Sequence, residues 1–154
     1  MGIASEKISI NGNSGQYEAI SFNRKKIHKP AITSRQRLIA ALNHQSTDRV
    51  CVDFGAGGQT GIGAGAVYRL RKAVLGNDNH RVKITEPYQM LGEIDDDLRK
   101  ALCLDVVGIA PPRTMFGFPC DDWKPFEMND GTPVLVPGKF NYTKNEAGDV
   151  FIYP

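Results

Sequence analysis

The residues best suited to chemistry lie in one stretch, residues 50–61, which reads Val-Cys-Val-Asp-Phe-Gly-Ala-Gly-Gly-Gln-Thr-Gly. Alternating apolar residues over 50–54 predict a short strand, and the glycines that follow must end it. Asp53, near the strand end, is a candidate catalytic acid or base. The open backbone after it makes five residues candidates for substrate binding: Gly57, Gly58, Gln59, Thr60 and Gly61. The alternative role for Asp53 is to cap the turn by accepting hydrogen bonds from nearby amides.

A second charged candidate, Arg113, follows a predicted strand over residues 104–110. Its guanidinium could pair with an anionic group, so it is a candidate catalytic residue; the alternative is an exposed loop arginine. The three cysteines and three histidines show neither C-x-x-C nor H-x-C spacing, so no metal site is predicted in this chain.

Residues 61–66, Gly-Ile-Gly-Ala-Gly-Ala, match the relaxed dinucleotide fingerprint, with Glu86 placed to meet a ribose. The fingerprint should follow a strand at once, whereas six residues separate Phe54 from Gly61. A small α/β dinucleotide-binding module is therefore an alternative function, and small residues packing a helix closely on a sheet are the simpler interpretation.

These residues need a scaffold, and the hydrophobic pattern predicts an α/β one. Thr33 and Gln36 fit a capping box for a helix of about three turns. Further helices are predicted over 61–75, ending at Gly76, and over 91–102, where acidic residues come first and basic ones last. Strands over 50–54, 82–85 and 104–110 alternate with these helices, which predicts a parallel sheet. The strand over 104–110 is expected to be buried on both faces.

The C-terminal region changes character after Pro112. Hairpins are predicted between residues 126–128 and 133–136, across an Asn-Asp-Gly turn, and between 139–143 and 150–153. We therefore expect a β-ribbon over about residues 124–154. Few parallel strands and a ribbon would leave an open sheet edge, which predicts a longer protein or self-association through that edge.

Charge divides the chain into a basic arm over residues 1–32 and a folded domain over residues 33–154. Residues 1–40 hold seven Lys and Arg against two acidic residues, and the remainder holds twelve against fifteen. This distribution argues against a nucleic-acid partner. Three widely spaced cysteines favour reduced thiols and a cytoplasmic protein. No apolar run approaches the length of a membrane span, so no membrane partner is expected.

Several short runs resemble the uroporphyrinogen decarboxylase family, which includes cobalamin-linked methyltransferases. Residues 33–38 (Thr-Ser-Arg-Gln-Arg-Leu), 40–45 (Ala-Ala-Leu-Asn-His-Gln) and 47–50 (Thr-Asp-Arg-Val) resemble the opening of the family. Residues 52–55 (Val-Asp-Phe-Gly), 60–62 (Thr-Gly-Ile), 88–91 (Tyr-Gln-Met-Leu) and 104–108 (Leu-Asp-Val-Val-Gly) look like the branch nearer the methyltransferases. The likeness covers about residues 33–112.

The resemblance implies the N-terminal part of a TIM (β/α)8 barrel with an inserted β-hairpin region, about half or less of a full family member. Decarboxylases carry an Arg-Gln-Ala-Gly-Arg run after the first strand, where residues 55–61 here contain no arginine. A Phe-Ser-Asp run that supplies their catalytic aspartate is replaced by residues 109–112, Ile-Ala-Pro-Pro.

The full-length protein is therefore expected to be a corrinoid-dependent methyltransferase, with zinc and a corrinoid as cofactors and a small-molecule substrate or corrinoid protein as partner. Its zinc ligands would come from later barrel strands, and this fragment alone is expected to be inactive. Two further functions stay open, namely tetrapyrrole decarboxylation by the full-length protein and a non-catalytic role as an interaction fragment.

Overall fold

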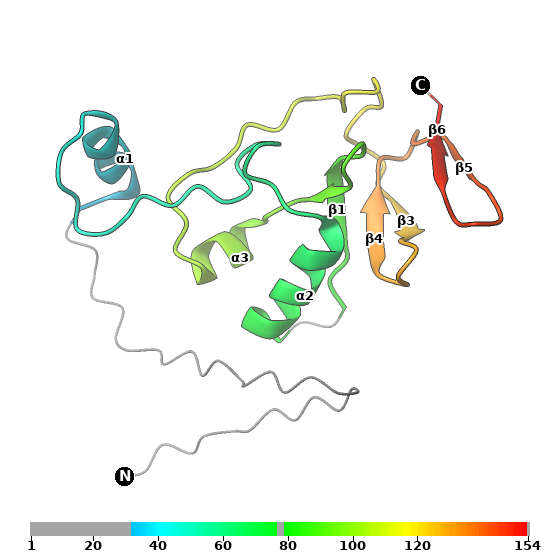
Figure 1. Cartoon of the computed structure of the whole chain (residues 1–154), viewed down its shortest axis with the longest axis horizontal. Coiled ribbons are helices and arrows are strands. Elements are labelled where there is room, and N and C mark those ends of the chain that lie inside the picture. Colours follow the sequence, from blue (N-terminus) through cyan, green and yellow to red (C-terminus); the bar gives the residue numbers. More distant parts are fainter. Residues whose placement is uncertain (1–31, 77–78, 154) are drawn as a thin grey trace, which may run out of the picture. The chain divides into compact units, whose positions relative to one another are not determined.

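The computed structural model describes residues 32–76 and 79–153, which form a mixed α/β structure (Figure 1). The predicted basic arm, except for Ile32, lies outside the described residues. Residues Ile32–Pro154 group into one compact unit. The described part contains helices, a four-stranded sheet and a two-stranded sheet, but no closed barrel. The α/β class predicted from the sequence is confirmed.

Capping residues mark the start of the first and third described helices and the end of the second. Helix α1, Ser34–Leu42, starts at a capping box in which Thr33 Oγ1 accepts from Gln36 N at 3.2 Å. Helix α2, Ala64–Leu75, ends at Gly76 with φ of 67°, a left-handed conformation that glycine adopts without strain. Helix α3, Asp96–Ala101, starts at Asp95, whose carboxylate accepts from Leu98 N at 3.0 Å. The predicted capping box at Thr33 and the predicted stop at Gly76 are confirmed, whereas α2 begins at Ala64 and not at residue 61.

The main sheet has the order β2-β1-β4-β3 and brings a middle segment beside a late one. Strand β1, Val82–Glu86, runs parallel to β4, Pro133–Val136, and antiparallel to the short β2, Leu91–Gly92. Strand β3, Lys124–Glu127, forms a hairpin with β4, and Gly131 in its turn has φ of 79°. Strands β5, Tyr142–Lys144, and β6, Val150–Ile152, form the second hairpin, so both predicted hairpins are present. The first hairpin is part of the main sheet and not of a separate ribbon, because β4 also pairs with β1.

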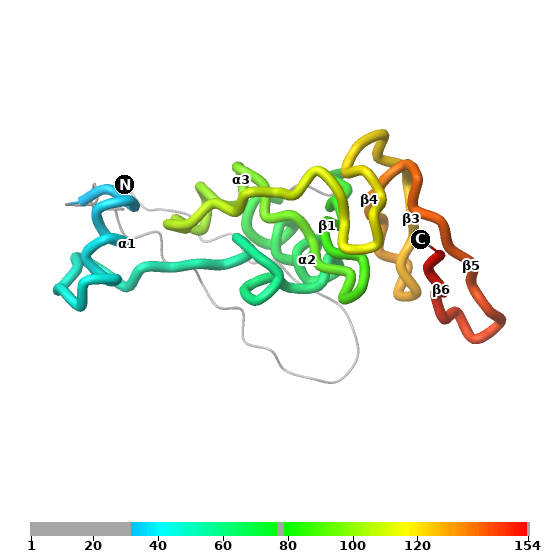
Figure 2. The backbone as a smooth tube through the Cα atoms, turned by 90° about the horizontal axis from the view of Figure 1, so that it is seen from above, coloured from blue at the N-terminus to red at the C-terminus, as the bar shows by residue number. Residues whose placement is uncertain are grey.

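The hydrophobic core lies between α2 and the centre of the main sheet. Figures 1 and 2 show α2 running beside β1. Ala64 and Val67 of α2 are fully buried, as are Val82 and Ile84 of β1 and Val134 and Val136 of β4. An aromatic cluster extends this core toward β5: the Phe140 ring lies 5.5 Å from Phe118, 6.0 Å from Phe126 and 5.4 Å from Tyr142. Such aromatic contacts stabilise beyond simple area burial.

Two predicted strands, 50–54 and 104–110, are not strands in the structure. They run side by side through one backbone hydrogen bond, from Asp105 N to Val52 O at 2.9 Å. The Val52 N–H donates to the Asp105 carboxylate at 2.9 Å, so a side chain replaces the backbone carbonyl that a ladder would use. Val107 and Ile109 are 62% and 98% exposed, so the expected burial on both faces is also wrong.

The predicted helix over 91–102 is too long at its start. Leu91 and Gly92 form β2 instead, and Gly92 N donates to Ile62 O at 3.0 Å. A Cβ on Gly92 would lie 2.8 Å from both Ala64 Cα and Val82 Cγ1. Tertiary contact with α2 and β1 therefore overrides the helical spacing of the apolar residues.

A buried ion cluster ties α1 to the rest of the unit. Arg37 is 1% exposed; its Nε lies 2.7 Å from Asp48 Oδ1 and its Nη1 lies 2.5 Å from Asp105 Oδ1. Arg49 Nη1 binds the other Asp105 oxygen at 2.7 Å. In the sequence, Asp105 was only the polar exception in a predicted apolar strand. In the structure, its carboxylate joins residues 104–110 to α1 and to residues 49–52.

Candidate functional site

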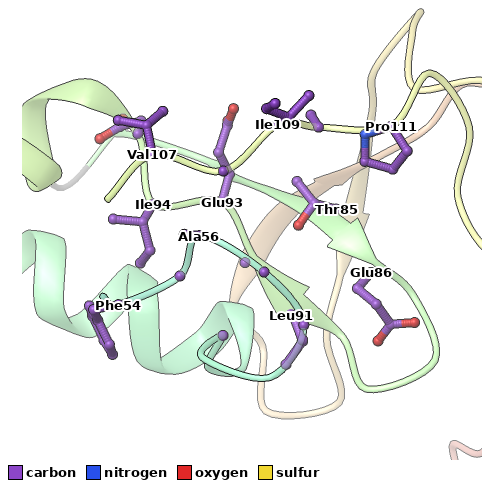
Figure 3. Close-up of a pocket in the computed structure, with 18 of the residues that line it drawn as sticks. Phe54, Ala56, Thr85, Glu86, Leu91, Glu93, Ile94, Val107, Ile109 and Pro111 are labelled. Carbon is purple, nitrogen blue, oxygen red and sulfur yellow. The ribbon is translucent and has the colours of Figure 1, made fainter. Parts of the chain in front are cut away.

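A cavity of about 650 Å³ lies at the carboxyl end of β1. Figure 3 shows Thr85 and Glu86 at the end of this strand, with Phe54 and Ala56 on one side and Val107, Ile109 and Pro111 on the other. The lining thus comes from residues 54–61, from the β1–β2 region through α3, and from residues 106–115. A cavity where several segments converge beside a strand end is the usual form of a ligand site in α/β proteins.

The glycine-rich loop after residue 54 closes on itself. Gly55 N donates to Thr60 O at 2.9 Å, and Thr60 N donates to Gly57 O at 3.2 Å. Gly55 has φ of 81° and lies against the Ile94 side chain, so a Cβ there would be both strained and obstructed. A Cβ on Gly61 would lie 2.9 Å from Leu91 Cδ1. These glycines are therefore needed for close packing of the loop against one wall of the cavity.

Some of the candidate residues line the cavity, and others only stabilise the glycine-rich loop. Gly57, Gly58, Gly61 and Arg113 line the cavity, whereas Asp53, Gln59 and Thr60 do not. Asp53 Oδ1 accepts from Ala56 N at 3.3 Å and from Thr60 Oγ1 at 3.1 Å. Asp53 thus holds the loop in the manner of a turn-capping aspartate, which was its alternative role.

The cavity is lined by six charged residues among those described, of which only Arg113 and Glu86 were site candidates from the sequence. Glu86, Glu93, Asp95, Asp96, Arg99 and Arg113 line it. Arg99 Nη2 lies 3.0 Å from Asp96 Oδ1, and this pairing lowers the pKa of Asp96. Glu86 accepts from Tyr88 N at 3.0 Å and from Gln89 N at 2.7 Å. Carboxylates outnumber guanidinium groups in the lining, so repulsion disfavours anions, and multiply charged anions most strongly.

The apolar part of the lining was not predicted as a site. Val107, Ile109 and Met115 are 62%, 98% and 67% exposed, and all three line the cavity. The pattern of residues 104–110 indicated a buried strand, so no sequence signal marked these side chains as accessible. Thr114, buried beside Arg113, was likewise missed because residues 115–123 show no regular period.

The dinucleotide fingerprint lacks the structural context that it requires. Residues 61–66 follow the glycine-rich loop, and no strand leads into them within the described part of the chain. The first amide of α2, Ala64 N, already donates to Met90 O at 2.8 Å. A phosphate at this helix start would have to displace that bond, which argues against a dinucleotide site here.

The described residues offer little to a metal ion. Within residues 32–76 and 79–153, no group of three His, Cys, Asp or Glu side chains is arranged to hold one. Cys51, Cys103 and Cys120 are free thiols, and burial followed by the nearby Asp121 charge raises the pKa of Cys120. Over the same residues, no helix has the length and apolar character needed to cross a bilayer.

Comparison of the chain with family models, with curated proteins and with solved structures gives no match. The class of protein shown by the fold is thus a mixed α/β unit with a cavity at a strand end.

Proposed function

We propose that this chain is the N-terminal part of a uroporphyrinogen-decarboxylase-like TIM-barrel enzyme, and that the full-length protein is a corrinoid-dependent methyltransferase. The single observation that carries the proposal is the cavity, in which the glycine-rich loop, the carboxyl end of β1 and residues 106–115 meet. Active sites of barrel enzymes form from the loops that follow successive strands, at the carboxyl end. The family-like runs of sequence supply two of these three segments.

The charge of the lining favours methyl transfer over tetrapyrrole decarboxylation. A porphyrinogen carries several carboxylates, which need several arginines. Residues 55–61 contain none, and Arg99 is already paired with Asp96 at 3.0 Å. Four carboxylate side chains in the lining would repel such a substrate.

The residues of this chain would bind and orient a small substrate, with the glycine-rich loop as one wall and Asp53 holding that loop closed. Zinc would activate a thiol acceptor and a corrinoid would carry the methyl group. The described residues do not fit a zinc site, since no suitable cluster of ligands occurs among them. We therefore assign no reaction step in this part of the chain to either group.

The test is a pair of assays on the full-length protein encoded by the reading frame that contains this chain. With zinc and a small thiol such as 2-mercaptoethanol, we expect the absorbance of methylcobalamin to change as its methyl group is transferred. Incubation with uroporphyrinogen should release no carbon dioxide. Decarboxylation without demethylation, or neither reaction, would overturn the proposed function.

A further inference from the structure

Arg113 stands out among the charged side chains of the cavity because it has no partner of opposite charge in the described part of the chain. Its Nη1 donates to the Gly117 carbonyl oxygen at 2.9 Å. The other charged groups are engaged: Arg99 with Asp96, Glu93 with Lys83, Asp95 with Arg71, and Glu86 with two backbone amides. Arg113 is exposed, as its alternative role as a loop arginine requires, so water solvates its charge in the free protein and the guanidinium is available to a ligand.

Thr114, the next residue, carries an unsatisfied hydroxyl. The residue is 6% exposed and lines the cavity, and its Oγ1 has no hydrogen-bond partner among the described residues. A buried hydroxyl without a partner costs folding free energy, so such groups are uncommon unless a ligand or ordered water completes them. The Oγ1 atom itself has almost no accessible surface, so a ligand would reach it once the Thr114 side chain rotates about χ1 toward the cavity, where Arg113 supplies the charged donor.

The loop that carries both residues is held in place before any ligand arrives. Thr114 N donates to Phe118 O at 2.8 Å, and Gly117 N donates to Thr114 O at 2.9 Å. Phe118 is buried, and its ring lies 5.5 Å from that of Phe140 in the aromatic cluster. An anchored loop loses little conformational freedom on binding, which favours affinity.

We propose that this cavity binds a small organic acid with a single carboxylate and an apolar body. The carboxylate is bound by the Arg113 guanidinium and the Thr114 hydroxyl, and the apolar body lies along Val107, Ile109 and Met115. The acidic side chains of the lining disfavour a dianion such as phosphate. The inference rests on the proposed use of this cavity as a substrate site, but its test requires no catalysis.

The test is a titration of the isotope-labelled 154-residue chain with hexanoate, hexanamide and inorganic phosphate, followed by amide NMR. We expect hexanoate to shift the resonances of residues 106–117 and to bind more tightly than either other probe. Arg113→Gln should weaken hexanoate binding roughly tenfold to hundredfold, because a charged hydrogen bond is lost. Arg69→Gln, which removes an exposed arginine outside the cavity, should leave binding unchanged.

Thr114→Val separates a binding role from a structural one. It removes an unpaired hydroxyl at nearly constant shape, so it should not lower the unfolding temperature, yet it should weaken hexanoate binding by about three- to tenfold. Phosphate binding as tightly as hexanoate, shifts away from residues 106–117, or unchanged affinity in Arg113→Gln would each overturn the inference. The methylcobalamin assay on the full-length protein does not depend on the binding of hexanoate. Failure of this inference can therefore be told apart from failure of the proposed function.

Discussion

Asp53 supports the glycine-rich loop through Ala56 N and Thr60 Oγ1, and this contact makes its role testable. Asp53→Ala removes the Oδ1 atom that accepts both hydrogen bonds, so we expect the free energy of unfolding to fall by about 1 kcal/mol. Amide exchange at Gly55 and Thr60 should become faster, as measured by NMR. Thr60→Val is the matched variant. Its effect should not add to that of Asp53→Ala, because both substitutions remove the hydrogen bond from Thr60 Oγ1 to Asp53 Oδ1. Unchanged exchange in Asp53→Ala would contradict this supporting role.

Asp105 receives hydrogen bonds from Arg37, Arg49 and Val52 N while its side chain is fully buried. Burial alone would raise the pKa of Asp105, but these hydrogen bonds outweigh it and leave the pKa lowered. Asp105→Asn leaves guanidinium charge without its buried counter-charge, and we expect a loss of about 3 to 5 kcal/mol in urea unfolding. Asp130→Asn, at the exposed pair with Arg69, is the control and should change stability far less. Equal effects of the two substitutions would refute the importance of the buried cluster.

Helix α1 depends on the same cluster, which gives it an acid-sensitive attachment. The hydrogen bond from Arg37 is the main reason that the pKa of Asp48 falls to about 2. In the unfolded chain an aspartate has a pKa of about 4. Because the folded pKa is the lower one, the stabilisation is complete above about pH 4 and is lost as the pH falls through about 2.

The acid transition can be followed at the Arg37 Nε–H resonance. We expect this resonance to lose its protection from exchange between about pH 4 and pH 2, together with the amides of α1. In Asp48→Asn the resonance should already be weakly protected at neutral pH. An α1 that stays protected well below about pH 2 would show that other contacts hold it.

The contact between the glycine-rich loop and residues 104–110 depends on Gly108. A Cβ at Gly108 would overlap the carbonyl oxygen of Ala56, whereas a Cβ at Gly58 would meet nothing within 4 Å. We expect Gly108→Ala to cost about 1 to 3 kcal/mol in thermal or urea unfolding. Gly58→Ala should stay within about 0.5 kcal/mol. Equal stabilities of the two variants would mean that these segments do not pack together in solution.

Sequence patterns predicted the elements whose determinants are local. The capping box of Thr33 and Gln36, the stop at Gly76 and the turn at Gly131 each depend on neighbouring residues, and each is confirmed. Residues 50–54 and 104–110 were predicted wrongly because strand formation needs a partner, and Asp105 supplies a side chain where the ladder needs a carbonyl. Glycine candidates in the loop were found, but Thr114 was not, because the irregular residues 115–123 that follow it gave no pattern from which its burial could be predicted.

On the scale of the whole chain, exposed apolar side chains favour self-association. Ile109 and Met115 are 98% and 67% exposed beside the cavity. Both residues line the cavity, and exposed apolar surface promotes contact between proteins. We expect the average mass of the chain in light scattering to rise with concentration, and Ile109→Lys to reduce that rise. Phe151→Lys, on β6, is the comparison variant. If it reduces the rise in average mass more than Ile109→Lys does, the chains associate through the edge of the β5–β6 hairpin and not through the surface beside the cavity.

The parallel pairing of β1 with β4 also has a consequence for how the chain folds during synthesis. Val82 is paired with Val134, so α3, the loop over residues 103–123 and the β3 strand must all leave the ribosome before this pairing can form. Until then the edge of β1 that pairs with β4 stays open, because the two-residue β2 lies along the opposite edge. Non-local pairings form slowly because loop closure comes first. The nascent chain would thus pass through an interval in which β1 is open to misassembly or to a chaperone.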